Sequence, residues 1–279
     1  MRPNSMHIIT LCSFKGGTAK TSTALSIGAC LAKTHKKRVL LVDFDSQANL
    51  SIGLGIGPDS EQTMVPVLQG TAKVQDIIIE ANIKGLFLIP ANAYLDGIES
   101  TSALVRDLNA HLRLRDALKS VEANFDFCFV DTPPSLGWLA QSAFFASQHT
   151  LICAIPEAYS VIGLRRLKEF QAYIQQYHPI DVLGVVLSLW DERGAVNQQF
   201  LQEINTSFPG KLFQSKIRRD ISVSRAVLQG KAVIEFDPTC RASEDYQQLT
   251  KELLGTIDRL SSAKSKLQML SKEKRKATV

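Results

Sequence analysis

The feature of this 279-residue sequence that most restricts its fold is a strand, turn and helix pattern near the amino end. The apolar run HIITLC at 7–12 is followed by the polar turn SFKGGTA and then by the helical pattern KTSTALSIGACLA. A glycine-containing turn between a strand and a helix directs backbone N–H groups and the positive end of the helix dipole to one point. The pattern predicts a phosphate-binding loop at 13–22.

The residue types in this turn fit a nucleotide triphosphate with Mg²⁺. Gly16 and Gly17 allow the tight turn, Lys20 is expected to neutralise the β- and γ-phosphates, and the Thr21 hydroxyl is expected to bind Mg²⁺. ATP and Mg²⁺ are therefore the predicted cofactors.

The turn departs from the standard pattern G-x-x-x-x-G-K-[ST] at two positions. Phe14, directly after Ser13, stands in place of the first glycine, and Ala19 stands in place of the second. If position 19 requires a positive φ, alanine costs about 1 kcal/mol relative to glycine, which weakens binding by less than about tenfold. We therefore expect the site to bind nucleotide.

The rest of the chain alternates between strand-like and helical patterns. Strands are predicted at 7–12, 38–44, 86–90, 125–131, 150–156, 182–190 and 211–217, and helices at 20–34, 102–123, 136–147, 159–177, 193–206, 220–229 and 243–261. Several strands are apolar on both faces, which is typical of parallel strands covered by helices on both sides. The sequence predicts an α/β fold, doubly wound, with a mostly parallel sheet flanked by helices.

The charge is concentrated at the carboxyl end. The whole chain carries +5, and residues 259–279 hold seven Lys/Arg and one Glu, so the remainder is close to neutral at −1. We predict a single domain at 1–262 and a basic tail at 263–279 that is either disordered or helical. The glycine-rich segment 53–66 is predicted to be a loop near the site.

Three segments together resemble the ParA/MinD group of deviant Walker ATPases, a class of P-loop NTPases. KGGTAKTS at 15–22 resembles the loop K-G-G-x-x-K-[TS], RVLLVDFDSQANLS resembles the segment V-D-x-D-P-Q-x-N, and FDFCFVDTPPSLG resembles the Walker B strand. The resemblance is carried further by segments near 182–200 and 216–249. There Trp190 replaces a tyrosine and Arg218 replaces a proline, which makes the adenine-side contacts less secure.

The resemblance implies a role for each matched position. Lys15 is the additional lysine that reaches the nucleotide of a partner subunit, Asp45 positions the attacking water, and Asp131 holds Mg²⁺ through water. Asp43 ends the strand before Asp45. The implied catalytic residues are Lys15, Lys20 and Asp45, and the metal residues are Thr21 and Asp131. The implied nucleotide-binding residues are Lys15, Gly16, Gly17, Thr18, Ala19, Lys20, Thr21, Ser22, Ile217 and Arg218.

The resemblance also implies partners. A ParA/Soj-type ATPase in plasmid or chromosome partition forms an ATP-dependent homodimer, binds DNA non-specifically, and hydrolyses ATP slowly until a ParB-like partner and DNA stimulate it. It is cytoplasmic and associated with the nucleoid. The basic side chains available for DNA are Arg219, Arg225, Lys231 and Arg241, with Lys211, Lys216 and the tail residues Lys272, Lys274, Arg275 and Lys276.

Two other functions fit the same scaffold. A MinD-like membrane-positioning ATPase would use the tail as an amphipathic helix, with Leu253, Ile257, Leu260, Leu267 and Leu270 at near-helical spacing. We expect the first three to pack on the sheet instead, so the membrane is not a predicted partner. A reductase or ligase on this fold is not favoured, because Cys128 and Cys153 lie within strands and nothing marks a substrate pocket.

Overall fold

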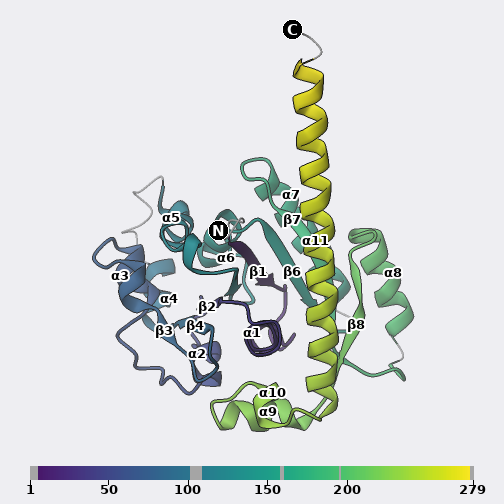
Figure 1. The fold of residues 1–279 in the computed structure, drawn as a ribbon. Coiled ribbons are helices and arrows are strands. Elements are labelled where there is room, and N and C mark those ends of the chain that lie inside the picture. Colours follow the sequence, from purple (N-terminus) through teal and green to yellow (C-terminus); the bar gives the residue numbers. More distant parts are fainter. Residues whose placement is uncertain (1–5, 101–108, 158–159, 195, 277–279) are drawn as a thin grey trace.

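The computed structural model describes residues 6–100, 109–157, 160–194 and 196–276. In this part of the chain one sheet of eight strands runs through the molecule in the order β3-β4-β2-β5-β1-β6-β7-β8 (Figure 1). All neighbouring strands are parallel except β3 and β4. The strands are β1 His7–Cys12, β2 Val39–Asp43, β3 Ile79–Glu80, β4 Leu86–Ile89, β5 Phe127–Asp131, β6 His149–Ala154, β7 Asp181–Trp190 and β8 Leu212–Arg218.

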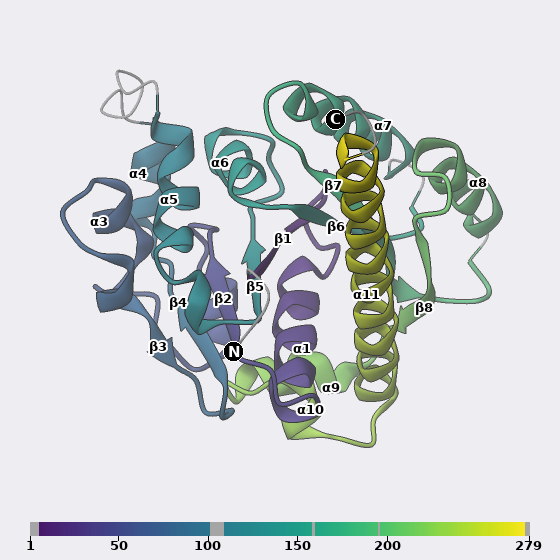
Figure 2. The same ribbon diagram turned by 45° about the horizontal axis from the view of Figure 1, so that its top comes forward.

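Helices cover both faces of the sheet (Figure 2). One face carries α1 Lys20–Lys33 and α11 Arg241–Lys276, with the short helices α2 Asn49–Gly53, α9 Ile221–Leu228 and α10 Val233–Phe236. The remaining helices are α3 Met64–Leu68, α4 Tyr94–Ser100, α5 Arg113–Lys119, α6 Trp138–Ala146, α7 Ser160–Gln175 and α8 Asn197–Ser207. The predicted doubly wound, mostly parallel α/β fold is confirmed.

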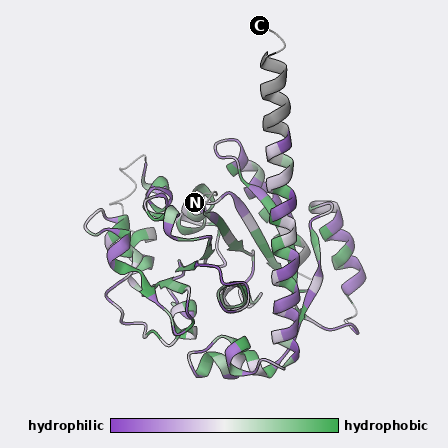
Figure 3. Ribbon diagram, in the orientation of Figure 1, coloured by the Kyte–Doolittle hydropathy of each residue, from purple (hydrophilic) through white to green (hydrophobic). Residues whose placement is uncertain are grey.

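The alternation of side chains along the central strands forms two cores. In β1, Ile9 and Leu11 are fully buried on the α1 and α11 face, whereas Ile8 belongs to the opposite core. A parallel strand buried on both faces must be apolar at nearly every position, which is what the runs at 7–12 and 39–43 provide. In Figure 3 these central strands are hydrophobic, while α11 is largely hydrophilic.

Helix α11 also covers the edge of the sheet. The carboxylate of Glu252 accepts hydrogen bonds from the backbone N–H groups of Gln214 and Ser215 in the edge strand β8, at 2.8 and 2.9 Å. Leu253 and Ile257 are buried in the core and Leu260 packs against it, as the sequence predicted. These three side chains therefore pack against the rest of the domain and do not form an exposed apolar face.

Several elements differ from the prediction, and the short helices α2, α3, α4 and α10 have no counterpart in it. The helix expected at 102–123 is replaced by a turn of 3-10 helix, Ala110–Leu112, and the short helix α5, and residues 102–108 lie outside the described residues. Strand β3 has two residues, which is too short to give a sequence pattern. The last helix does not end near 261 but continues to Lys276 and extends beyond the body (Figure 1).

Candidate functional site

The predicted phosphate loop connects β1 to α1 at the carboxyl edge of the sheet. Gly17 has φ 76°, and Ala19 has φ 61° and ψ 28°, so both adopt the left-handed conformation. Helix α1 begins at Lys20 without a side-chain cap and without an acidic residue in its first turn. Its first N–H groups are therefore available to an anion, which the positive end of the helix dipole also favours.

Ser13 makes a contact that the motif comparison did not reveal. The Lys20 ammonium group is buried and donates to the Ser13 Oγ at 3.0 Å, and this hydroxyl donates to the backbone oxygen of Lys15 at 2.8 Å. A glycine at position 13 would have no such group. Ser13 thus holds Lys20 at the mouth of the loop when no phosphate is bound.

Lys15 is exposed and forms an ion pair with Glu157 of the same chain. Glu157 follows β6, so residues 142 positions apart in the sequence meet at the edge of the sheet. No motif in the sequence marked Glu157, because only the neighbourhood of β1 and β6 brings it to the loop. The lysine expected to act on a partner subunit is therefore held by its own chain in this structure.

Asp131 and Asp43 end neighbouring strands and lie opposite each other in the β2–β5 register. The Asp131 Oδ2 accepts a hydrogen bond of 2.6 Å from the Thr21 hydroxyl. Asp43 accepts hydrogen bonds from the Ser51 N–H and hydroxyl groups at 2.8 and 2.7 Å. Burial, together with the neighbouring Asp43 carboxylate, raises the pKa of Asp131 to about 7. Burial also raises the pKa of Asp43 to about 6, against the effect of the Ser51 hydrogen bonds.

The Thr21 and Asp131 pair has the donors that Mg²⁺ prefers. The Asp131 Oδ1 is buried and has no hydrogen-bond partner among the described residues. A buried carboxylate oxygen without a partner is costly, and a hard cation or its water would satisfy it. The residues present therefore fit a magnesium ion.

We expect the two raised pKa values to make the free energy of unfolding depend on pH. Both carboxyls titrate from an ordinary value of 3.8, so between about pH 4 and pH 7 the native state binds more protons than the unfolded state. Their stabilising contribution is complete below about pH 4 and is lost as the pH rises to about 7. Asp131→Asn should reduce this decline, measured by urea unfolding with EDTA from pH 4.5 to 8. An equal decline in both proteins would contradict proton uptake by Asp131.

Asp45 lies just beyond β2 and is half-buried. Its Oδ1 accepts a hydrogen bond from the Gln47 N–H at 3.1 Å, and its own N–H donates to Asp43 at 3.4 Å. The other carboxylate oxygen has no protein hydrogen bond in the described part of the chain and is available to water or substrate. The structure thus brings Asp43, Asp45 and Asp131 to the same edge as the phosphate loop.

Ala19 adopts the strained left-handed conformation in the absence of a ligand, so Ala19→Gly should affect stability more than ATP affinity. Relief of the left-handed conformation should raise the free energy of unfolding by about 1 kcal/mol. Because the strain is present in the unliganded loop, ATP affinity should change by less than about threefold. Ala48, with φ 52° before α2, offers a comparison outside the loop, and because its methyl group is fully buried, Ala48→Gly should stabilise less than Ala19→Gly. Unchanged stability in Ala19→Gly would mean that the loop carries no strain.

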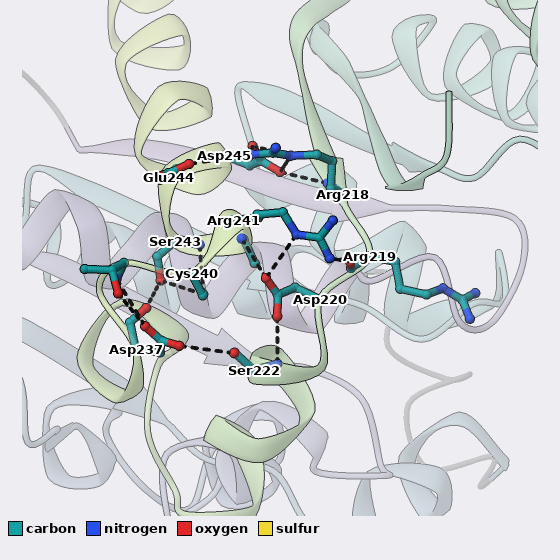
Figure 4. Close-up of polar contacts among 12 residues, drawn as sticks. Arg218, Arg219, Asp220, Ser222, Asp237, Cys240, Arg241, Ser243, Glu244 and Asp245 are labelled. Carbon is teal, nitrogen blue, oxygen red and sulfur yellow. Dashed lines mark hydrogen bonds and ion pairs between the residues drawn. The ribbon is translucent and has the colours of Figure 1, made fainter. Parts of the chain in front are cut away.

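The predicted adenine-side residues lie at the end of β8. Ile217 is 3% exposed and belongs to the core. The Arg218 guanidinium is held by Asp245, with Nη2 2.7 Å from Oδ1, and the same carboxylate accepts the Arg218 N–H at 2.9 Å (Figure 4). Neither side chain is free to reach a base without rearrangement.

The predicted DNA-binding side chains follow β8 in the chain and lie on α9, in the turns on either side of it, and at the start of α11. Arg219, Arg225, Lys231 and Arg241 are all exposed. Arg241 donates to the Arg219 backbone oxygen at 3.2 Å and lies 3.9 Å from Asp220, while the Arg219 side chain points away from this network (Figure 4). Asp220 caps α9 through the Ser222 N–H.

The basic tail is not part of that group. Residues 241 and 272 lie on one helix, and 31 residues at a rise of 1.5 Å separate them by about 46 Å. The helix begins at the carboxyl edge of β8, where Asp245 meets Arg218, and runs away from the phosphate loop. Within the described part of the chain no helix is sufficiently long and apolar to cross a membrane.

Comparisons with known proteins agree on one group. An AAA domain family model matches residues 6–182. A ParA family protein of Chlamydia muridarum is 50% identical over 89% of this chain and 98% of its own length. The sporulation initiation inhibitor protein Soj of Bacillus subtilis is 38% identical over 88% of this chain and 97% of its own length. A solved structure of cobyrinic acid a,c-diamide synthase from Mycobacterium smegmatis, with bound ADP and magnesium, has a TM-score of 0.77 at 26% identity and covers 89% of this chain and 94% of its own.

Proposed function

Because this chain belongs to the ParA family of partition ATPases, we propose that it binds ATP with Mg²⁺, dimerises on ATP, and binds DNA non-specifically until a ParB-like partner stimulates hydrolysis. The observation that carries the proposal is the meeting of a phosphate loop, two lysines and three aspartates at one edge of the sheet. The similar M. smegmatis structure, which holds ADP and magnesium, supports this use of the edge.

The phosphate loop would bind the triphosphate through the backbone N–H groups of residues 15–22. Lys20 would leave the Ser13 hydroxyl and pair with the β- and γ-phosphates, exchanging a neutral partner for an anionic one. The backbone around Ile217 and Arg218 would contact the base. Charge on the buried Lys20 is then neutralised only when nucleotide is bound.

Thr21 and Asp131 would hold Mg²⁺, directly through the hydroxyl and through water at the carboxylate. When bound, the ion neutralises negative charge on the phosphate oxygens. Asp131 must then lose its proton, because a coordinating carboxylate is ionised. Asp45 is half-buried near Asp131 and would orient the attacking water through its available carboxylate oxygen.

Lys15 would act across the dimer interface. A second ammonium group near the γ-phosphate stabilises charge on the transferring phosphoryl group only after two subunits have closed, as an arginine finger does. In this structure Lys15 is 47% exposed at its side chain and is paired with Glu157. Dimer closure would therefore exchange an intrasubunit carboxylate for a phosphate of the partner subunit.

The exposed group Arg219, Arg225, Lys231 and Arg241 would bind DNA phosphates. Contacts with phosphates do not recognise the base sequence, which is consistent with non-specific binding. The tail of α11 lies about 46 Å farther along the helix and would be a separate basic region. The protein would act in the cytoplasm, on the nucleoid.

The ATPase rate with and without DNA tests this proposal, together with ATP-dependent co-sedimentation on DNA and on anionic liposomes. We expect DNA binding only with ATP, and the double variant Arg219→Gln, Arg225→Gln should weaken it and reduce the slope of log affinity against log salt by about two. Lys84→Gln removes an exposed cation from the opposite edge and serves as the control. Binding to liposomes in place of DNA would favour a membrane-positioning ATPase.

A further inference from the structure

Asp45 lies on the loop that joins β2 to α2, and both ends of this loop are fixed. Directly before Asp45, the Phe44 N–H donates to the Asp131 backbone oxygen at 2.9 Å, which continues the pairing of β2 with β5. At the far end, the Ser51 N–H and hydroxyl groups donate to the Asp43 Oδ2 at 2.8 and 2.7 Å. The sheet therefore fixes the start of the loop, and Ser51 fixes its end.

The Ser51 hydroxyl also connects this loop to a second strand. It accepts a hydrogen bond of 3.0 Å from the backbone N–H of Ala91, which follows β4, and β4 pairs with β2. Ser51, Asp43 and Ala91 are all fully buried. A buried polar network whose members have their partners is rigid, because breaking one bond leaves a buried group unpaired. The hydroxyl thus joins α2 to the ends of β2 and β4.

The other hydrogen bonds of Asp45 cannot fix its position. In the described part of the chain its carboxylate accepts one bond, from the Gln47 N–H at 3.1 Å, and its backbone oxygen accepts the Ala48 N–H at 2.9 Å. Both donors belong to the loop itself and would move with Asp45. A group that orients a reactant must hold its geometry closely, since a misplacement of about 1 Å can cost about a hundredfold in rate. The anchors at the two ends of the loop must provide this.

We infer that Ser51 is a positioning residue for hydrolysis, because its hydroxyl fixes the loop that presents Asp45 to the attacking water. This inference rests on the proposed function, in which Asp45 orients that water. The side-chain hydrogen bonds of Ser51 go to Asp43 and Ala91, and neither belongs to the phosphate loop. Loss of the hydroxyl should therefore slow hydrolysis and spare nucleotide binding.

Ser51→Ala and Ser51→Thr separate the rate from the binding. Ser51→Ala keeps the N–H bond to Asp43 and loses the hydroxyl, so we expect kcat and kcat/KM to fall together by about tenfold. Affinity for a non-hydrolysable ATP analogue with Mg²⁺, measured by calorimetry, should change by less than about twofold. Ser51→Thr keeps the hydroxyl and should have a kcat within about twofold of the original.

Ser142→Ala is the matched control. Ser142 is fully buried on α6, and its hydroxyl donates to the His111 backbone oxygen at 3.1 Å. This variant also removes a buried hydroxyl and should lose stability in urea, but its kcat should remain that of the original. An equal loss of kcat in Ser142→Ala and Ser51→Ala would overturn the inference, because lower stability alone would then explain both.

Hydrogen exchange provides a measurement that does not depend on activity. With Mg²⁺ and the ATP analogue bound, the amides of residues 44–50 should exchange about tenfold faster in Ser51→Ala than in the original protein or in Ser142→Ala. Unchanged exchange or unchanged kcat in Ser51→Ala would overturn the role of Ser51. Asp45→Asn distinguishes that failure from failure of the proposed function, since a normal kcat in Asp45→Asn would overturn both.

Discussion

Lys20→Ala should abolish measurable nucleotide binding and leave the fold intact. Lys20 is 7% exposed, and among the described residues its ammonium group has one hydrogen-bond partner, the neutral Ser13 hydroxyl, so its charge is poorly compensated without phosphate. Charge-assisted hydrogen bonds contribute about 1.5–3 kcal/mol each, and loss of contacts to two phosphates should weaken binding by at least about a hundredfold. Calorimetry with Mg²⁺ and a non-hydrolysable ATP analogue measures the loss.

The control for this substitution is Ser13→Gly. It removes the hydrogen bond to Lys20 but keeps the ammonium group. We expect an affinity within a few-fold of the original. Urea unfolding should show that Lys20→Ala is at least as stable as the original, because a buried cation has been removed. ATP affinity retained in Lys20→Ala would refute the assignment of the loop.

The sequence was sufficient to predict the sheet and the position of the site. Strand patterns such as 7–12 and 125–131 are apolar on both faces, and a parallel sheet places the residues that follow them at one edge. Asp43, Asp131 and the loop therefore lie at the same edge of the sheet, and the packing of the helices does not change this. Periodicity predicts the strands, whereas the loop motif and the family resemblance identify the residues at their ends.

Contacts between distant segments could not be predicted in this way. Glu157 pairs with Lys15, and Ser51 holds Asp43, because of loop paths that no local pattern encodes. Arg218 was expected near the base, but its ion pair with Asp245 depends on how α11 lies against β8. The left-handed conformation of Ala19 could not be predicted either, because the residues of a short polar turn do not determine its backbone φ angles.

The length of α11 separates two basic regions that follow each other in the sequence. In the sequence, the cations after 211 form one series. On the fold, Arg241 lies at the carboxyl edge, and the segment after 272 lies about 46 Å away along the helix. A DNA duplex bound at α9 would have to extend about 46 Å, or roughly 14 base pairs, to meet both regions. Truncation of the tail and substitution of Arg219 are thus independent experiments.

Lys15→Gln should spare ADP binding and prevent ATP-driven dimerisation. In the proposed dimer the Lys15 ammonium group reaches the partner's γ-phosphate, and glutamine cannot supply that charge. Within one subunit the lysine faces Glu157 instead, so a lone subunit loses only an exposed ion pair, which contributes at most about 1 kcal/mol. Sedimentation velocity with ADP and with a non-hydrolysable ATP analogue measures both states.

Glu157→Gln is the matched substitution, because it releases Lys15 without removing it. If Glu157 competes with the partner's phosphate for Lys15, the variant should dimerise at up to about fivefold lower protein concentration. The two substitutions break the same ion pair but should shift dimerisation in opposite directions. Only transfer of Lys15 from its own carboxylate to the partner's nucleotide produces that opposition. Dimers of normal stability in Lys15→Gln, or impaired dimers in both variants, would contradict it.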